Sequence, residues 1–249
     1  MVLLRLLLIG LYAVFWGGMA ALVGPFDRSG EFGVFAARRF IRWVLASCRV
    51  EVDVAGLGHI DPDRSYVVMA NHQSLFDIAA IVATLPLSFR FVAKRELTRI
   101  PFFGWGLVAA GHVIVDRGNT EASVRSLRRA AERVRSGVTV IIFPEGTRSR
   151  TGELRRFRSG GFHLAMEAGV AILPATVSGS QRINQAHSLR VEPGRMHVTY
   201  GEPIPTDRWP PERRAELIDR VRAAILAGFD PAYQEGRDAE DPGRRLGAS

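Results

Sequence analysis

His72 and Asp77 stand five positions apart in the segment NHQSLFD, where a short apolar run gives way to an apolar helical segment. A histidine can accept a proton near neutral pH, and a carboxylate one helical turn away can bind its second ring N–H and fix the tautomer. The pair therefore predicts a general base with its orienting group. A structural interpretation also exists, because Ser74 and Asp77 match a helix-capping box and His72 could be only a polar loop residue.

The sequence offers no protein nucleophile to complete such a pair. No G-x-S-x-G segment occurs, and the single cysteine, Cys48, lies in an expected membrane-proximal helix. We therefore expect the nucleophile to be a hydroxyl group of the substrate. The histidines lack the spacing of a zinc site, so we predict no metal, and one cysteine excludes an internal disulfide.

A second polar segment, FPEGTRSR at residues 143–150, follows the most apolar strand candidate. Arg148 offers a planar guanidinium suited to phosphate, and Gly146 permits a tight turn. Thr147 and nearby backbone N–H groups could add donors. A charged turn after a strand can equally be a solvated loop, so this segment alone leaves both interpretations open.

Two further cations stand at the ends of strand candidates. Lys94, the only lysine of the chain, follows the run FRFVA, and Arg117 follows HVIVD. A point charge on a flexible stem, such as Lys94, suits phosphate capture. The aromatic residues between them, Phe102, Phe103 and Trp105, are explained by core packing as well as by a ligand.

The elements that must position these residues alternate between strand and helix patterns. Strand-like runs lie at 49–56, 66–70, 89–93, 112–116, 137–143, 170–179 and 195–201. Helical patterns lie at 75–85, 120–135, within 157–169 and from Pro210 to Gly228. This alternation predicts an α/β fold with a mixed, partly parallel sheet flanked by helices. Loops at strand ends are where such sheets commonly build sites.

The N-terminal segment indicates a membrane element. Residues 6–26 carry no charge, and as a helix they would be about 31 Å long, close to the hydrocarbon thickness of a bilayer. A spanning helix, a helix dipping into one leaflet and a cleaved signal peptide are all possible. The signal peptide has least support, because the apolar run is long and no A-x-A site follows it.

The next segment, residues 31–50, has the pattern of an amphipathic helix. Arg38, Arg42 and Arg49 fall on one side, with aromatic and aliphatic residues on the other. This pattern is typical of a basic interfacial helix beside anionic lipid, and a helix packed on the protein's own core is the alternative. If residues 6–26 span, the positive-inside rule places residues 28 onward in the cytoplasm, so we expect the cytoplasmic face of the plasma (inner) membrane.

Composition limits the classes of protein that the chain can belong to. It has 249 residues, 47% of them apolar, and a net charge of +8. This apolar content excludes a wholly disordered chain, and one long uncharged run argues against a polytopic membrane protein. The positive charge suggests an anionic partner, but no aromatic-interleaved basic groove is visible, so we expect no nucleic-acid partner. We expect membrane-anchoring helices at 1–48, a catalytic domain at 49–229 and a loose polar tail at 230–249.

In their order along the chain, these motifs resemble the blocks of the glycerolipid acyltransferase family. The resemblance is closest to the 1-acylglycerol-3-phosphate (lysophosphatidate) acyltransferases. The family's four blocks are N-H-x-x-x-x-D, an aliphatic strand ending in arginine, F-P-E-G-T-R-S, and an aliphatic strand with an embedded proline. Here they read NHQSLFD, GHVIVDR, FPEGTRS and AILPATVSG, within a region of about residues 50–205.

The resemblance implies transfer of an acyl chain from an acyl-CoA or acyl carrier protein thioester to the free hydroxyl of a lysophospholipid, without a cofactor. The product would be phosphatidate, a step of phospholipid biosynthesis. By the same resemblance, His72 is the general base and Asp77 orients it. The residues implied in holding the acceptor and its phosphate are Glu145, Gly146, Thr147, Arg148, Lys94 and Arg117.

Other functions stay open at this point. The same chemistry could act on another lysolipid or on glycerol 3-phosphate. A hydrolase would release the acyl chain to water. A non-catalytic protein of a different class would bind anionic membrane lipid through the same basic surface.

Overall fold

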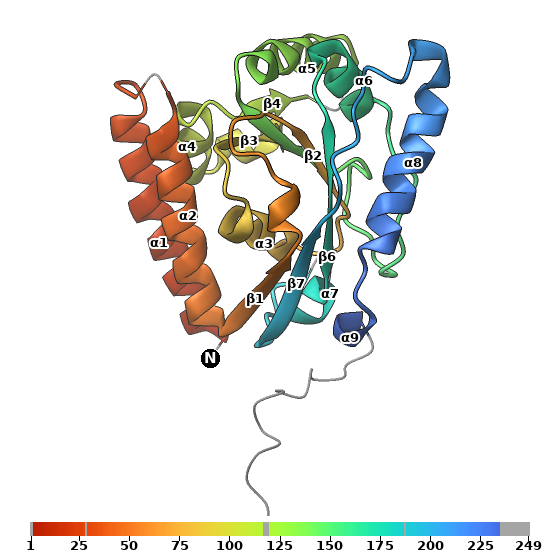
Figure 1. Ribbon diagram of the computed structural model, residues 1–249. Helices are drawn as coiled ribbons and strands as arrows, with labels where there is room; N and C mark the ends of the chain where they lie inside the picture. Colours follow the sequence, from red (N-terminus) through yellow and green to blue (C-terminus); the bar gives the residue numbers. More distant parts are fainter. Residues whose placement is uncertain (1, 28, 117–119, 187, 235–249) are drawn as a thin grey trace, which may run out of the picture.

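The computed structural model describes residues 2–27, 29–116, 120–186 and 188–234, and these build a seven-stranded sheet with helices on both faces (Figure 1). The strands lie in the order β1-β7-β6-β2-β5-β3-β4. Their bounds are Val50–Ala55 (β1), Val67–Ala70 (β2), Phe89–Lys94 (β3), Val113–Val115 (β4), Thr139–Ile142 (β5), Ile172–Ser178 (β6) and Gly194–Tyr200 (β7).

The direction of the strands determines where the polar motifs meet. Strands β6, β2, β5, β3 and β4 are parallel to one another. Strand β7 is antiparallel to β6, and β1 is parallel to β7. The predicted α/β fold with a mixed, partly parallel sheet is therefore confirmed. Because parallel strands end at the same edge, the segments that follow β6, β2, β5 and β3 lie along one edge of the sheet.

Two hydrophobic cores lie on opposite faces of this sheet. Helices α2 (Glu31–Cys48) and α3 (Phe76–Thr84) cover one face, and α5 (Thr120–Arg135), α6 (Gly160–Ala168) and α8 (Arg214–Ala227) cover the other (Figure 1). The central strands β2, β5 and β6 are buried along their whole length, which explains their continuous apolar runs. The remaining elements are α1 (Val2–Val23), α4 (Phe103–Ala109), α7 (Ser180–Ile183), α9 (Pro231–Gln234) and short 3-10 turns at Leu57–His59, Arg95–Arg99 and Pro211–Arg213.

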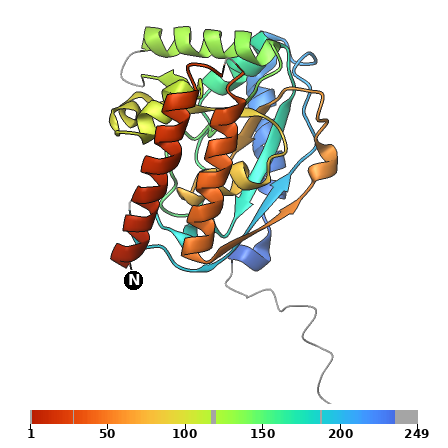
Figure 2. The same cartoon turned by 90° about the vertical axis from the view of Figure 1, so that its left-hand side faces the viewer.

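Helix α1 is long and apolar enough to cross a membrane by length and composition. It nevertheless lies along the domain, side by side with α2 and in contact with α4 (Figure 2). Its Gly17 allows this close approach, because a Cβ there would stand 2.6 Å from the carbonyl oxygen of Phe102. Near its start, Arg5 donates a hydrogen bond to the carbonyl of Val191 at 2.7 Å. These contacts place α1 against the domain.

Helix α2 uses its apolar side mainly within the protein. Val34, Ile41, Val44 and Leu45 join the core beneath it. The expectation that Arg38 faces lipid is wrong, because its guanidinium donates to the carbonyls of Leu85 and Leu87 at 2.9 and 2.8 Å, beyond the end of α3. The packing alternative therefore describes much of this helix.

Three short helices, α4, α7 and α9, were not expected from the sequence. The aromatic cluster lies at the start of α4, where Phe102 precedes the first turn with a positive φ of 60°. At the other end of the chain, α9 lies within the segment expected to be a loose tail. There the Tyr233 hydroxyl donates to the carboxylate of Asp53 at 2.6 Å, which fixes this turn against β1.

Candidate active site

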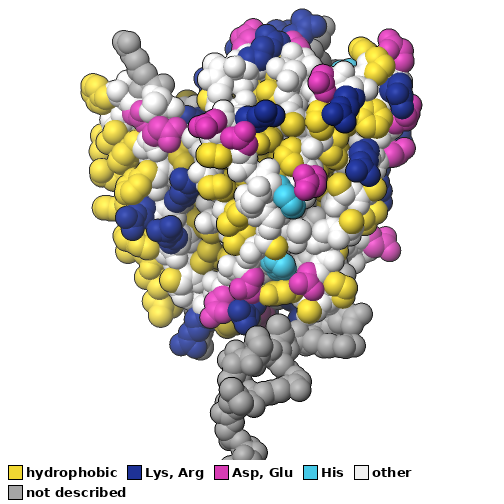
Figure 3. All heavy atoms as spheres, viewed as in Figure 1, with side chains coloured by type: hydrophobic (Ala, Val, Ile, Leu, Met, Phe, Trp, Pro, Cys, Tyr) yellow, Lys and Arg dark blue, Asp and Glu magenta, His cyan; other side chains and the backbone are white. Residues whose placement is uncertain are grey.

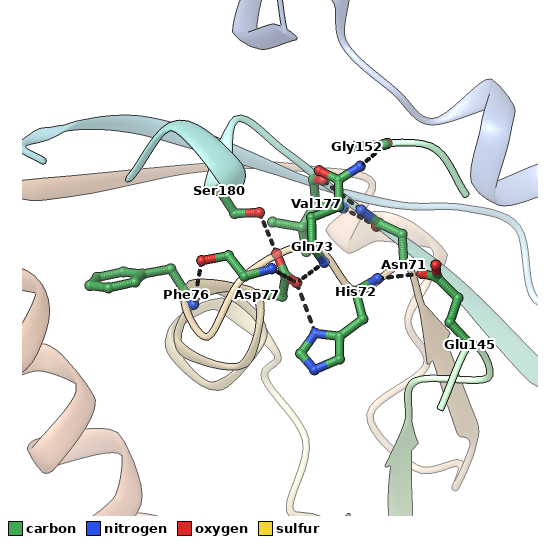
Figure 4. Close-up of polar contacts among 10 residues, drawn as sticks. Asn71, His72, Gln73, Phe76, Asp77, Glu145, Gly152, Val177 and Ser180 are labelled. Carbon is green, nitrogen blue, oxygen red and sulfur yellow. Dashed lines mark hydrogen bonds and ion pairs between the residues drawn. The ribbon is translucent and has the colours of Figure 1, made fainter. Parts of the chain in front are cut away.

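His72 and Asp77 meet at the carboxyl end of β2, and their side chains face each other (Figure 4). His72 follows the strand in the loop Asn71–Leu75, and Asp77 lies in the first turn of α3. The ring Nδ1 of His72 stands 2.9 Å from Oδ2 of Asp77. A carboxylate accepts, so Nδ1 carries the hydrogen and Nε2 keeps its lone pair.

Asp77 is completely buried and is surrounded by donors. Its Oδ2 accepts hydrogen bonds from the backbone N–H groups of Gln73 and Ser74 at 2.6 and 2.8 Å, in addition to the His72 ring. Its Oδ1 accepts from the hydroxyl of Ser180. All four partners offer a hydrogen, which suits a charged carboxylate and holds it in one orientation.

The capping interpretation of Asp77 and the catalytic one are both compatible with this geometry. Asp77 binds the N–H of Ser74 at the start of α3, as the second half of a capping box would. The Ser74 hydroxyl accepts from the N–H of Phe76 at 3.1 Å instead of from Asp77. One carboxylate therefore fixes both the helix start and the histidine.

The His72 ring is held by the Asp77 carboxylate and by one aromatic neighbour. It stacks on the ring of Phe143, at the end of β5, with centroids 4.1 Å apart and planes at 20°. Its side chain is 14% exposed. A mostly enclosed imidazole whose Nδ1–H is held by Asp77, and whose Nε2 forms no hydrogen bond within the described residues, has the geometry of a general base.

Glu145 connects the FPEGTRSR loop to His72. It is buried, and its two carboxylate oxygens accept from the backbone N–H groups of His72 at 2.6 Å and Arg155 at 2.9 Å. The same loop also donates to this segment, since the N–H of Ser149 binds the His72 carbonyl at 2.7 Å. Burial raises the pKa of Glu145, and the two backbone hydrogen bonds oppose that rise. Both oxygens are therefore engaged by backbone N–H groups, and Glu145 braces the loop against the segment that carries His72.

Gly146, Thr147 and Arg148 form the turn after β5. The N–H of Gly146 donates to the Phe143 carbonyl at 3.0 Å, and its φ of 73° is a left-handed conformation that glycine adopts without strain. Thr147 is exposed and Arg148 is partly buried. The turn therefore presents a hydroxyl and a guanidinium at the same sheet edge as His72.

Of the two cations predicted at neighbouring strand ends, the structure describes Lys94 but not Arg117. Lys94 ends β3, is about half exposed, and its ammonium pairs with Glu96 at 2.9 Å. It stands at the same edge as His72 but has no direct contact with it among the interactions of the described residues. Arg117 lies outside the described residues.

Ser180 is a member of this site that the sequence motifs missed. It follows β6 and the left-handed turn at Gly179, 103 positions from Asp77. Asn71 ties the same strands together, since its side chain exchanges hydrogen bonds with the backbone of Val177 at 2.7 and 2.9 Å. Only the pairing of β2 with β6 brings Ser180 to Asp77, and no local pattern signals it.

The arrangement supports proton transfer at His72 Nε2 beside basic groups. Within the described part of the chain, no group of three or more His, Cys, Asp or Glu side chains is placed to hold a metal ion.

Comparisons with known proteins agree on one family. A family model described as "Acyltransferase" matches residues 51–178. A 1-acyl-sn-glycerol-3-phosphate acyltransferase of Pseudomonas aeruginosa is 33% identical over 239 residues, covering 92% of this chain and 91% of that protein. One of Cocos nucifera is 32% identical, covering 85% of this chain and 69% of the relative.

A solved structure gives the same relationship at the level of the fold. The crystal structure of the 1-acyl-sn-glycerophosphate (LPA) acyltransferase PlsC from Thermotoga maritima superposes with a TM-score of 0.77. The two chains are 28% identical, and the match covers 91% of this chain and 93% of that one.

Proposed function

This chain belongs to the acyltransferase family and is an O-acyltransferase, and we propose that it acylates the free hydroxyl of 1-acylglycerol 3-phosphate to form phosphatidate. The acyl donor is a thioester, acyl-CoA or acyl carrier protein. The observation that carries the proposal is the His72 ring, held by Asp77 through Nδ1, which leaves Nε2 as the ring atom that can take a proton. The names of the relatives supply the acceptor.

The proposed reaction uses His72 as general base. Nε2 takes the proton of the acceptor hydroxyl while its oxygen attacks the thioester carbonyl, so that a C–O bond forms. When the tetrahedral intermediate collapses, the C–S bond breaks and the thiolate receives that proton from His72. Asp77 stabilises the imidazolium in between. The nucleophile comes from the substrate, which agrees with a site that supplies a base and no serine or cysteine nucleophile.

The acceptor's phosphate is the part that the basic turn would hold. We propose Arg148 as its bidentate ligand, with Thr147 as an added donor and Lys94 as a point charge at the next strand end. Glu145 and Gly146 act on the acceptor indirectly, by giving the turn its shape. Arg117 stays a candidate from the sequence alone.

An exposed apolar surface matches a lipid substrate. Figure 3 shows apolar side chains gathered over α1 and α2. The exposed large apolar side chains of α1, α2 and the α4 region include Leu4, Leu7, Leu11, Phe15, Leu22, Phe35, Trp43, Ile100, Trp105 and Val108. We propose that this membrane face enters one leaflet, on the cytoplasmic side, and that α1 lies in it beside α2 and does not cross it.

The test is product analysis with the purified full chain. Radiolabelled acyl-CoA and acyl carrier protein are each offered with lysophosphatidate, a neutral-headgroup lysolipid or glycerol 3-phosphate. We expect acylation of lysophosphatidate at a rate at least about tenfold above the neutral-headgroup lysolipid, because an arginine–phosphate contact is charge-assisted. We expect a similar preference over glycerol 3-phosphate, which keeps the phosphate but has no acyl chain to bury. Free fatty acid without a new diacyl lipid would overturn the proposal in favour of a hydrolase, and preference for another acceptor would overturn the named substrate.

A further inference from the structure

A groove lies between the segment 156–159 and helix α8, and the acceptor chemistry above does not use it. Its volume is about 890 Å³. Arg156, Arg158 and Arg222 line it, together with Ile218 and Asp219. Three guanidinium groups against one carboxylate make it a basic concavity.

The arginines of this groove differ in what holds them. Arg222 is fixed, because it donates to the carbonyls of Leu154 and Arg155 at 3.0 and 2.9 Å and lies over the ring of Phe157. Arg156 and Arg158 are exposed, and among the described residues neither forms an ion pair. Two guanidinium groups without an ion pair, in the same groove as the fixed guanidinium of Arg222, favour an anion with more than one charge.

The groove adjoins the catalytic loop. The N–H of Arg158 donates to the Pro144 carbonyl at 2.8 Å, and its side chain packs against Gly146, where a Cβ would stand 2.7 Å from Nε. The neighbouring N–H of Arg155 binds Glu145, which in turn binds the N–H of His72. A ligand in the groove would therefore contact the same loop that is bound to the backbone of His72 through Glu145.

The position of the groove in the molecule matters for a two-substrate reaction. Helix α8 stands on one flank of the sheet, and α1 and α2 stand on the opposite flank (Figure 1). If the membrane face carries the lipid acceptor, the groove faces water on the other side of the same loop. An acyl donor has an apolar acyl chain and a polar, charged end. The acyl chain would lie towards the membrane face, and the charged end would lie towards the groove.

We propose that this groove binds the phosphate-bearing nucleotide end of an acyl-CoA donor, with Arg156 and Arg158 on its phosphates. The inference rests on the proposed acyl transfer. The groove's volume is within the range of about 300–1,000 Å³ typical of small-molecule sites. A carrier protein would instead need an interface of about 800 Å² on each partner. The pantetheine arm would then pass over the Gly146 turn to bring the thioester to His72.

The test compares two thioesters on one set of variants. Arg156→Gln and Arg156→Glu are assayed with acyl-CoA and with an S-acyl N-acetylcysteamine, which lacks every phosphate. We expect the KM for acyl-CoA to rise about tenfold with Gln and further with Glu, with kcat within about twofold, and no change with the truncated thioester. Arg220→Glu, an exposed arginine of α8 outside this groove, is the matched control and leaves both KM values unchanged.

The outcomes separate this inference from the function on which it rests. A wild-type chain that fails to acylate lysophosphatidate with any of the thioester donors would reject the proposed function itself. An active wild type whose KM for acyl-CoA is unchanged in both Arg156 variants would overturn only the groove. A wild type that uses acyl carrier protein but not acyl-CoA in the product analysis would also overturn it, because the groove would then have no nucleotide to bind.

Discussion

Asp77 both caps α3 and orients His72, so a single residue links the stability of the fold to the geometry of the site. The spacing of His72 and Asp77 was enough to predict their pairing, because both lie within one strand–loop–helix unit. Ser180 could not be predicted in this way, since its contact depends on the order of β2 and β6 in the sheet. The resemblance implied that Glu145 helps to hold the acceptor, and only the structure shows that backbone N–H groups bind its two oxygens.

At the residue scale, Ser180→Ala tests how Asp77 is held. The change removes the donor to Oδ1 of a buried carboxylate, which costs about 1–3 kcal/mol in the free energy of unfolding. We expect kcat to fall about tenfold with little change in the KM of either substrate, because the orientation of His72 is loosened. Ser136→Ala, which removes an exposed hydroxyl at the end of α5, serves as the control. An unchanged kcat in Ser180→Ala would show that Ser180 does not position the pair.

His112 gives a pH-dependent stability at the same scale. Its ring Nδ1 accepts from the N–H of Phe91 at 2.9 Å, and burial, followed by the charges of Arg90 and Arg133, lowers its pKa to about 3. The unfolded chain binds a proton near its ordinary value of about 6.5, and the folded chain does not. Stability is therefore fully present above pH 6.5 and is lost as the pH falls below it.

The corresponding variant is His112→Asn, whose side-chain oxygen can still accept from Phe91. Between pH 7 and pH 5, a histidine that stays neutral in the folded state lowers the free energy of unfolding by about 2 kcal/mol. Because the His112 side chain is only partly buried, we expect a loss of about 1 kcal/mol. Urea unfolding at the two pH values measures this. The wild type should lose about 1 kcal/mol more than the variant, and equal losses would contradict a neutral His112 in the folded state.

At the scale of elements, the seven strands and the long helices followed from periodicity and breaker residues. Helix α4 was missed because its segment IPFFGWG reads as an aromatic cluster rich in glycine, and it is helical through its packing on α1. The path of α1 was also open, since an apolar run of this length suits a spanning helix as well as a packed one. The structure shows contacts with α2 and α4 that hydrophobicity alone does not specify.

Gly17→Val tests the packing of α1 against α4. The new side chain would meet the carbonyl of Phe102, whereas a Cβ at Gly10 of the same helix meets nothing within 4 Å. Overpacking typically costs about 1–3 kcal/mol, so we expect Gly17→Val to unfold at a lower temperature in detergent than Gly10→Val. Both substitutions change helix propensity equally, which makes Gly10→Val the matched control. Identical melting of the two would show that α1 does not pack on α4.

At the scale of the whole molecule, the positive charge is used in more than one place. Arg38 binds carbonyls inside the fold, Arg148 stands at the catalytic turn, and Arg156 lines the groove beside α8. The net charge of +8 therefore indicated anionic ligands without showing where they bind. The exposed apolar surface of α1, α2 and the α4 region lies on the flank away from α8. The proposed lipid acceptor and the proposed acyl-CoA donor would therefore approach one loop from two sides.

Trp105→Glu tests whether the α4 region belongs to the membrane face. Trp105 is about half exposed, and burying a large apolar side chain in a leaflet contributes about 1.5–3 kcal/mol. We expect binding to anionic lipid vesicles to weaken at least about tenfold in a sedimentation assay. Leu226→Glu changes an exposed apolar residue of α8 on the opposite flank and should bind as the wild type does. Equal binding by both variants would restrict the membrane face to α1 and α2.

The central claim is that His72, oriented by Asp77, removes the proton of a lipid hydroxyl as that hydroxyl attacks a thioester. The most direct measurement is the rate of phosphatidate formation from lysophosphatidate and an acyl thioester by purified wild type and His72→Ala, with thermal unfolding as the check on folding. The account predicts a loss of about 10²–10⁴-fold in kcat with the melting temperature and lysophosphatidate binding retained. A folded His72→Ala protein that forms phosphatidate within a few fold of the wild-type rate would contradict it.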